Sequence, residues 1–403
     1  MKFAYKFRAY PSKAQKAILH HQMCLSKELY NFLLVKSKEH FKDTGKTFSE
    51  YDMNKWITKF KKEYPQYQEI HSQVLQNISF RLHGAYKNFF RRVKEKRNGK
   101  HQNVGFPRFR KFTSSLTYPD SGFKIDRKNV HLSTIGNVNF VNHREIEGEI
   151  NTLTIKKTKS QEWFITFSVK KGDRPFVPNG KAQVGLDLGL KEYATLSDNV
   201  KIPNMRFGKE YEKRLIKSHR KVSRRAKGSR NRRKAAVLLS KVYDKITKRR
   251  EDFAHKFSHN LVNSYSFIAY EDLQIRNMAK NHKLAKSIND ASWARFTQFL
   301  CYKAESAGCR VVDVLPQYTS QTCHICGSVQ EMSLEMRIFD CGKCGLQIDR
   351  DLNASKNILR LGLEKSPTTE GHSGSHASGD IVRPPHMEAD VAESGTTSGA
   401  VHD

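Results

Sequence analysis

The chain has 403 residues, enough for a sizeable core and for several domains of roughly 100 to 200 residues each. It carries 72 lysines and arginines against 40 acidic residues, which gives a formal net charge of +32 at pH 7. Like charges at this density repel one another, so we expect a polyanionic partner that neutralises them. No run approaches the about eighteen apolar residues of a membrane span, and residues 1–10 alternate charged and aromatic side chains. We therefore expect neither a membrane-spanning nor a secreted protein.

The N-terminal quarter predicts one strand followed by helices. Residues 2–10 place Phe3, Tyr5 and Phe7 on one face and basic side chains on the other, which is typical of a half-buried strand. Ser12 then follows a proline and can cap a helix. Apolar residues recur at helical spacing from there, so we expect a helical segment over residues 12–97.

Short alternating stretches with frequent turn signals follow the helices. They predict the strands of a small sheet or β-barrel over residues 98–175. The strand at residues 1–11 is expected to belong to the same sheet, which would make the helical segment an insertion. A polar stretch with two prolines at 172–181 is the best domain boundary in the chain.

Strands alternate with helices beyond the boundary, which indicates an α/β domain over about residues 181–363. The last forty residues, 364–403, are rich in Gly, Ser, Thr, Pro and His and hold seven acids and two bases. Because they contain almost no large apolar side chains, we expect a disordered tail.

Four of the seven cysteines form two pairs, Cys323-x-x-Cys326 and Cys341-x-x-Cys344, separated by fourteen residues and each followed by a glycine. Two such knuckles can place four thiolates around one structural Zn²⁺ and leave no position for catalytic water. A disulfide or redox pair is the weaker alternative, and His324 could compete as a ligand. We expect the other three cysteines in the core: Cys24, Cys301 and Cys309.

Three acids stand where a carboxylate needs a cation. Asp187 lies in the apolar strand VGLDLG, Glu271 ends the apolar strand FIAYE, and Asp351 begins a probable helix after the cysteine pairs. From these positions they can converge on a pair of Mg²⁺ or Mn²⁺ ions that hydrolyses a phosphodiester. Asp272 is an alternative to Glu271 as the metal ligand. We prefer Glu271 because alternate residues of a strand face the same side, and Glu271 would face inward together with Phe267 and Ala269. Asp349 competes with Asp351, and spacing alone leaves that choice open.

These residues carry a family likeness. The chain resembles the TnpB (OrfB) proteins of insertion sequences, compact RNA-guided nucleases related to the type V CRISPR effectors. The likeness covers about residues 1–363 and is carried, in family order, by FRAYPSKAQ, GFPRFRKF, GLDLGLKEYATLSD, YEDLQIRNM, TSQTCHICG and DRDLNASKNI. The sequence departs from the family pattern at Ser355, where alanine is common, and at Asn199, where glycine is common. Neither departure removes one of the three carboxylates.

The resemblance implies a multidomain α+β fold. Its parts would be a WED-like β-barrel (1–11 and 98–175), a REC-like helical domain (12–97), a RuvC nuclease domain of RNase H-like fold (181–318 and 346–363) and an inserted zinc ribbon (319–345). It also implies that Asp187, Glu271 and Asp351 form the catalytic triad and hold two Mg²⁺ or Mn²⁺ ions, since Asp351 stands two residues before Asn353 in the D-x-N-A pattern. The four paired cysteines match the family's zinc ligands.

The function implied by the resemblance is a transposon-encoded, RNA-guided DNA endonuclease. It would bind a guide RNA (ωRNA) from the transposon end and cut double-stranded DNA beside a short motif, acting as a monomer in the prokaryotic cytoplasm, at the nucleoid. The alternatives are a DNA transposase that needs no RNA, a structure-specific RuvC-type nuclease and a non-catalytic RNA-guided repressor.

A basic stretch between Lys213 and Lys234 holds twelve lysines and arginines in twenty-two residues and no acid. The alternative interpretation is a solvated helix or a basic tail without a binding role. Because the stretch lies between the first two catalytic acids, we expect its charge near the scissile strand, where it would bind phosphates of RNA or heteroduplex. The candidate contacts are Lys213, Arg214, Arg220, Lys221, Arg224, Arg225, Arg230, Arg232, Arg233 and Lys234, with Arg108 and Arg110 extending the surface.

Overall fold

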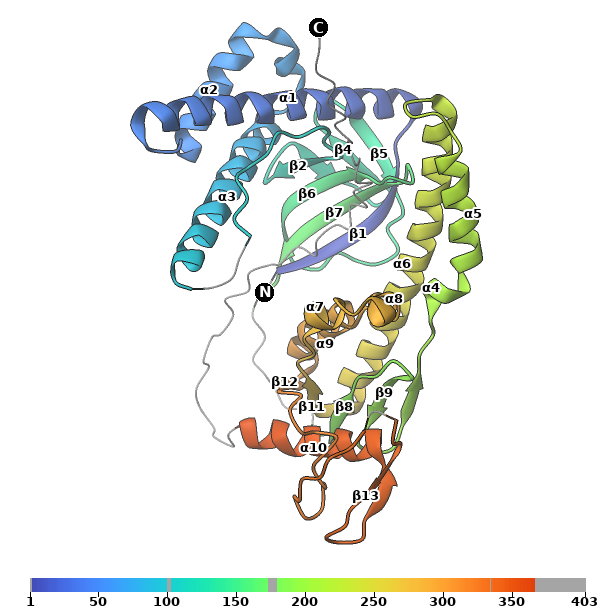
Figure 1. Ribbon diagram of the computed structural model, residues 1–403. Helices are drawn as coiled ribbons and strands as arrows, with labels where there is room; N and C mark the ends of the chain where they lie inside the picture. The colour runs from blue at the N-terminus through green and yellow to red at the C-terminus, as the bar shows by residue number, and fades with distance from the viewer. Residues whose placement is uncertain (1, 100–102, 173–179, 334, 367–403) are drawn as a thin grey trace, which may run out of the picture.

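The computed structural model describes residues 2–99, 103–172, 180–333 and 335–366 of the chain. Two sheets lie toward opposite ends of the molecule, and the long helix α6 (Arg230–Ser264) runs between them (Figure 1). The larger sheet carries the N-terminal helices. The smaller sheet carries the C-terminal helix and the cysteine pairs. None of the described helices is long and apolar enough to cross a membrane.

The N-terminal lobe begins as the sequence predicts. Strand β1 (Lys2–Tyr10) buries Phe7 and Ala9, and Ser12 and Gln15 form a reciprocal capping box at the start of α1 (Lys13–Thr44). The other helices of the inserted segment are α2 (Glu50–Glu63), the 3₁₀ helix η1 (Pro65–Glu69) and α3 (Ser72–Arg97). The last of them ends where the helical pattern of the sequence ends.

The large sheet has seven strands in the order β2-β6-β7-β1-β5-β4-β3, and every pair is antiparallel. The N-terminal strand lies between β7 and β5, so α1, α2 and α3 follow one strand of this sheet and precede the others in the chain. The expected barrel is a curved sheet, and its edge strands β2 and β3 do not pair with each other in the described part of the chain. The remaining strands are β2 (Ser115–Pro119), β3 (Phe123–Ile125), β4 (Asn129–Leu132), β5 (Gly136–Phe140), β6 (Glu149–Lys157) and β7 (Trp163–Lys170).

The C-terminal lobe is the expected α/β unit. Its five-stranded sheet has the order β10-β9-β8-β11-β12, in which β8, β11 and β12 are parallel. The strands are β8 (Ala182–Asp187), β9 (Glu192–Leu196), β10 (Lys201–Pro203), β11 (Tyr265–Glu271) and β12 (Arg310–Val314), with a hairpin of β13 (Ile338–Asp340) and β14 (Gln347–Asp349). Besides α6, the helices are α4 (Phe207–Glu210), α5 (Glu212–Ser223), α7 (Ile275–Met278), α8 (His282–Ala291), α9 (Trp293–Ala307) and α10 (Arg350–Lys365).

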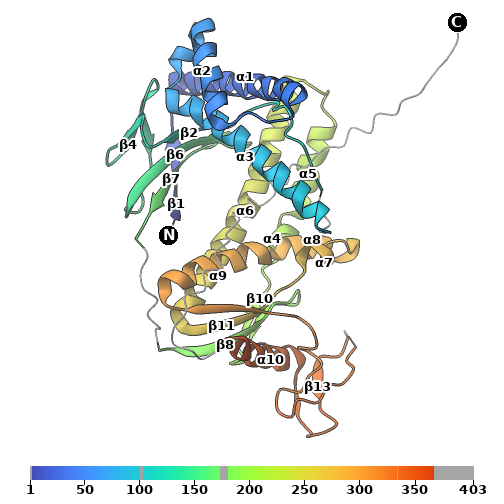
Figure 2. The same cartoon turned by 90° about the vertical axis from the view of Figure 1, so that its left-hand side faces the viewer.

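Helices cover both faces of the small sheet (Figure 2). Val184 and Leu186 of β8 face α6 and α9, where they pack with Phe257 and Phe296. The alternate residues face α10. A side chain at Gly185 would begin 2.0 Å from the Ser355 carbonyl oxygen, so the backbones of β8 and α10 lie in direct contact.

The two lobes meet along α6. Lys248 of α6 pairs with Glu162 at 2.9 Å, and Asp244 accepts a hydrogen bond from Ser160, both in the connection that leads into β7. These interactions lie near the middle of the helix.

The structure tests some of the remaining sequence predictions and leaves others untested. Most of the predicted boundary at 172–181 and of the disordered tail lies outside the described residues, although α10 continues to Lys365, two residues past the expected end of the domain. The prediction that all three unpaired cysteines lie in the core is wrong, because Cys24 and Cys301 are exposed and Cys309 alone among them is buried.

Candidate active site and zinc ribbon

Strand register places two acids side by side. Leu186 of β8 is paired with Tyr270 of β11 in a parallel ladder, so Asp187 and Glu271 are neighbours at the carboxyl ends of adjacent strands. Adjacent strands lie about 4.8 Å apart, and residues in register point to the same face. That face is the one covered by α10, since Glu271 shares parity with the buried Ala269. Asp272 is exposed, which favours Glu271 as the sequence predicts.

The third acid comes from the first turn of α10. Asp351 follows Asp349, which is the N-cap residue and accepts hydrogen bonds from the backbone N–H groups of Asp351 and Leu352 at 3.0 and 3.1 Å. The other oxygen of Asp349 pairs with Lys201 at 2.8 Å. Asp349 therefore has a structural role that the sequence had left open, and Asp351 lies next to the strand acids.

The pKa of Asp187 responds to the neighbouring acids. Burial raises the pKa of Asp187 well above its usual range, and the negative charges of Glu271, Asp351 and Asp349 raise it further, while Arg350 opposes them. Burial also raises the pKa of Glu271, and a hydrogen bond from the Thr319 hydroxyl partly offsets that effect. The site concentrates negative charge that lacks enough cationic partners.

A divalent cation fits this donor set. Hard carboxylate oxygens are the ligands that Mg²⁺ and Mn²⁺ prefer, and a cation would relieve the repulsion that raises the pKa of Asp187. The carboxylates are not drawn tightly together, however. Asp351 accepts from Arg350 at 3.0 Å and lies 4.0 Å from Arg337. Among the described residues, only the four cysteines bring three or more ligand atoms within 4.8 Å of one another.

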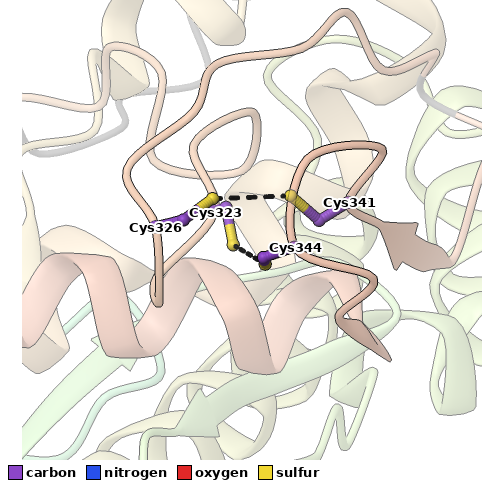
Figure 3. A group of neighbouring side chains, drawn as sticks. All are labelled: Cys323, Cys326, Cys341 and Cys344. Carbon is purple, nitrogen blue, oxygen red and sulfur yellow. Dashed lines mark hydrogen bonds between the residues drawn. The ribbon is translucent and has the colours of Figure 1, made fainter.

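The cysteine pairs form a compact centre (Figure 3). Cys323 and Cys344 have their sulfurs 3.6 Å apart, as do Cys326 and Cys341. Four sulfurs at about 2.3 Å from one zinc ion would be about 3.8 Å apart, whereas a disulfide needs about 2.05 Å. The geometry therefore fits a structural zinc site and excludes disulfides between these pairs.

Each knuckle closes on a glycine. The backbone N–H of Gly327 donates to the Cys323 carbonyl at 3.0 Å, and that of Gly345 donates to the Cys341 carbonyl at 2.8 Å. Both glycines have φ near +70° (71° and 73°), a left-handed conformation that side chains disfavour. The Ser328 hydroxyl lies 3.3 Å from the Cys341 sulfur, and the hydrogen bond between them lowers the pKa of Cys341 to about 6, whereas the pKa of Cys344 is raised to about 12.

Buried amides, which the sequence analysis did not single out as functional, fasten the ribbon to α10. Asn353 accepts from the backbone and the ring of His324 at 3.0 and 2.9 Å and donates to the Thr322 carbonyl at 2.7 Å. His324 is thus turned toward α10 and lies outside the sulfur cluster. One turn later, Asn357 donates to the carbonyls of Thr319 and Thr322 at 2.9 and 2.6 Å. Two asparagines at i and i+4, and so on one face of the helix, were the available sequence signal.

The basic stretch forms a helical hairpin of α5 and the start of α6, held by a hydrogen bond between His219 and Tyr243 at 2.8 Å. All of the candidate contacts on the hairpin are exposed except Arg232. The Arg232 guanidinium donates to the carbonyls of Val222 and Arg225 at 3.2 and 2.9 Å, so it fixes the turn of the hairpin.

The basic hairpin lies far from the three acids (Figure 1), so its position near the scissile strand stays a prediction. Helix α6 has 35 residues and spans about 50 Å at a rise of 1.5 Å per residue. Its basic beginning lies at the end of the molecule that holds α1, while β8 and α10 lie at the other end (Figures 1 and 2). Nearness in sequence to Asp187 and Glu271 does not bring the hairpin near them (Figure 1).

The arginines of the GFPRFRKF segment differ in exposure. Arg108 is exposed, whereas Arg110 is half-buried and lies 3.9 Å from the centre of the Tyr30 ring. The backbone of Arg110 is also held on α1 by both polar atoms of the Asn31 side chain. Arg110 thus joins two segments of the N-terminal lobe.

Comparisons with protein families divide the chain into three matches. Residues 166–282 match a family described as a probable transposase, residues 293–358 match the Cas12f1-like TNB domain, and residues 1–46 match a helix-turn-helix domain. Within the last match, the described structure holds strand β1 and a single uninterrupted helix that reaches Thr44.

Individual relatives match nearly the whole chain. The chain is 32% identical over 381 residues to a putative RNA-guided DNA endonuclease of Streptomyces pristinaespiralis, with 92% of each chain covered. It is 28% identical over 381 residues to the putative RNA-guided DNA endonuclease InsQ of Escherichia coli K12, which covers 89% of this chain and 92% of InsQ. The chain therefore belongs to the TnpB (OrfB) family.

Solved structures match more distantly. The mini-RNA-guided endonuclease CRISPR-Cas phi3 aligns with a TM-score of 0.48 at 13% identity, covering 92% of this chain and 94% of that chain.

Replacing one ligand should empty the zinc site. We expect Cys341→Ser to lower the zinc content from about one ion per chain to near zero, because three remaining ligands do not close a structural site. Elemental analysis of the purified protein measures this content, and thermal unfolding should show a less stable C-terminal lobe. Cys24→Ser, which changes an exposed cysteine on α1, is the matched control and should retain the zinc.

Proposed function

We propose that the protein is a transposon-encoded, RNA-guided DNA endonuclease that cuts double-stranded DNA beside a short motif by metal-assisted hydrolysis. The observation that carries the proposal is the placement of Asp187 and Glu271 side by side on adjacent strands, with the pKa of Asp187 raised by burial and by the negative charges of Glu271 and Asp351. The names of the relatives, putative RNA-guided DNA endonucleases, support the choice of reaction.

The chain's own residues account for the chemistry in the following way. Asp187 and Glu271, on rigid adjacent strands, and Asp351, on the first turn of α10, would hold two Mg²⁺ or Mn²⁺ ions. When bound, such ions activate water and stabilise the leaving oxygen of a phosphodiester. The two strands fix the backbone positions of Asp187 and Glu271, because buried ladders hold the strands themselves in place. Arg350 would hold Asp351 until the cations neutralise it.

The zinc ribbon has a structural part in this proposal. Its four cysteines fill the zinc coordination, so hydrolysis would proceed at the carboxylates alone. The buried amides of Asn353 and Asn357 fix the ribbon to the helix that supplies Asp351. Residues 319–345 therefore support the nuclease domain.

The basic hairpin would bind the phosphate backbone of the guide RNA or of its heteroduplex with target DNA. Its exposed guanidinium and ammonium groups contribute affinity that does not depend on sequence. The hairpin and the carboxylates are separated by about the length of α6, roughly 50 Å. A heteroduplex of about 20 base pairs is long enough to reach between the two sites.

Removing a catalytic acid should abolish cleavage and spare RNA binding. We expect Glu271→Gln to lower plasmid cleavage by the copurified RNA–protein complex at least about 100-fold, since even outer-shell partners of metal ligands contribute about 10- to 100-fold. Asp272→Asn alters the exposed neighbouring acid and should cleave normally. The amount and sequence of the copurified RNA should be the same for both variants.

Three outcomes would count against the proposal. Normal cleavage by Glu271→Gln would refute the assigned acids. Cleavage or strand transfer by protein freed of RNA would favour a transposase or a structure-specific nuclease that needs no guide, and an absence of copurified RNA in the wild type would point the same way.

Arginines at the turn of the hairpin should bind phosphates. We expect the double variant Arg224→Gln, Arg225→Gln to bind RNA more weakly whatever its sequence, and the dependence of log affinity on log salt to flatten by about one unit for each arginine that binds a phosphate. Affinity measured over a range of salt concentrations tests this. Lys256→Gln removes an exposed charge at the opposite end of α6 and should leave the slope unchanged. Equal slopes for all three proteins would remove the hairpin from the nucleic-acid surface.

A further inference from the structure

The Glu271 carboxylate has a buried neighbour, Thr319, which is not one of the three proposed metal ligands. The hydroxyl of Thr319 donates a hydrogen bond to Oε1 of Glu271, and both residues are buried, with 4% and 8% of their surfaces exposed. A glutamate has three rotatable side-chain bonds, so its strand fixes the Cα position and leaves the orientation of the carboxylate open. A hydrogen bond from a fixed donor restricts the carboxylate to one orientation.

Thr319 is itself fixed. It lies in the connection between β12 and the first zinc knuckle, where its neighbour Tyr318 is 63% exposed and has φ of 61°. The chain thus turns Thr319 inward while Tyr318 faces solvent. The Thr319 carbonyl accepts from the side chain of Asn357 at 2.9 Å, which ties this backbone to α10.

The same helix holds the next residues of the connection. Asn357 also donates to the Thr322 carbonyl at 2.6 Å, and Asn353 donates to the same oxygen at 2.7 Å. Both asparagines are almost fully buried, at 1% and 0% exposure. Buried amides without partners are costly, so these bonds hold the connection in one position.

We propose that Thr319 is a positioning residue for the nuclease reaction, whose hydroxyl holds the Glu271 carboxylate in the orientation that a divalent cation needs. The backbone leading into the zinc ribbon is then part of the nuclease site, and α10 positions two of its three acids: Asp351 directly, and Glu271 through Asn357 and Thr319. This inference rests on the proposed function, because it assumes that Glu271 is a metal ligand.

The experiment uses the RNA–protein complex and Mn²⁺ as the probe. Mn²⁺ binding is followed by electron paramagnetic resonance, with the Asp187→Ala complex as the background for ions bound to RNA. Cleavage of a plasmid target is measured in parallel against Mn²⁺ concentration. We expect Thr319→Val to weaken Mn²⁺ binding about 10- to 100-fold and to raise the Mn²⁺ concentration for half-maximal cleavage by the same factor. Cleavage at saturating Mn²⁺ should largely recover.

Matched variants separate positioning from packing. Thr319→Ser keeps the hydroxyl and should restore Mn²⁺ affinity to within a few-fold of the wild type. Thr322→Val removes a hydroxyl from the same connection, where it donates only to the Tyr318 carbonyl, and should behave as the wild type. If Thr319→Val does not fold, Thr319→Ala takes its place in the comparison with Thr319→Ser.

The inference is overturned if Thr319→Val binds Mn²⁺ as the wild type does, or if the valine and serine variants are equally impaired. Glu271→Gln distinguishes a failure of the positioning role from a failure of the proposed function. If it loses Mn²⁺ while Thr319→Val retains it, the positioning role alone is refuted. If Glu271→Gln itself retains Mn²⁺ and cleavage, the assignment of the acids fails and the inference fails with it.

Discussion

Helix α10 lies against strand β8 so closely that a single methyl group at position 185 would begin 2.0 Å from a carbonyl oxygen of the helix. A glycine is needed at this point, and Gly362 makes a similar approach to Ala269 on β11. This packing brings the last element of the described chain onto the strands that carry Asp187 and Glu271. It places Asp351 beside them and gives the zinc ribbon its attachment through Asn353 and Asn357.

The consequence of that arrangement is concentrated negative charge. Asp187 and Glu271 are held against a packed helix with few counter-ions, and the pKa of each is raised. Arg350 and Arg337 offset part of the charge at Asp351. The two groups of side chains thus differ in their physical basis. The cysteines form a closed cluster, whereas the carboxylates stay apart and their negative charges raise the pKa of Asp187.

Much of this architecture could be predicted from residue patterns. Alternation in residues 2–10 predicted β1, the spacing of the cysteines predicted the ribbon, and the parity of Glu271 with Ala269 distinguished it from Asp272. The choice of Asp351 came from the family resemblance, because spacing alone did not separate it from Asp349. The capping geometry of Asp349 is visible only in the structure.

Tertiary contacts explain what the sequence could not show. Helix α6 packs on the small sheet and pairs with the connection between β6 and β7, so the basic hairpin lies far from the acids that flank it in sequence. In the sequence Arg232 cannot be distinguished from its basic neighbours. In the structure its guanidinium donates to two backbone carbonyls of the hairpin. Thr319 and Glu271 are 48 residues apart, and no local pattern pairs a threonine before a zinc knuckle with an acid at the end of a strand.

The central claim is that Asp187, Glu271 and Asp351 together form the metal-binding centre of the nuclease. Crystals of the RNA-bound protein soaked in Mn²⁺ test it most directly, by anomalous diffraction measured at the manganese absorption edge. The account predicts anomalous peaks between these three carboxylates, at a distance from the zinc of the ribbon. Peaks elsewhere, with none at the three acids, would contradict it.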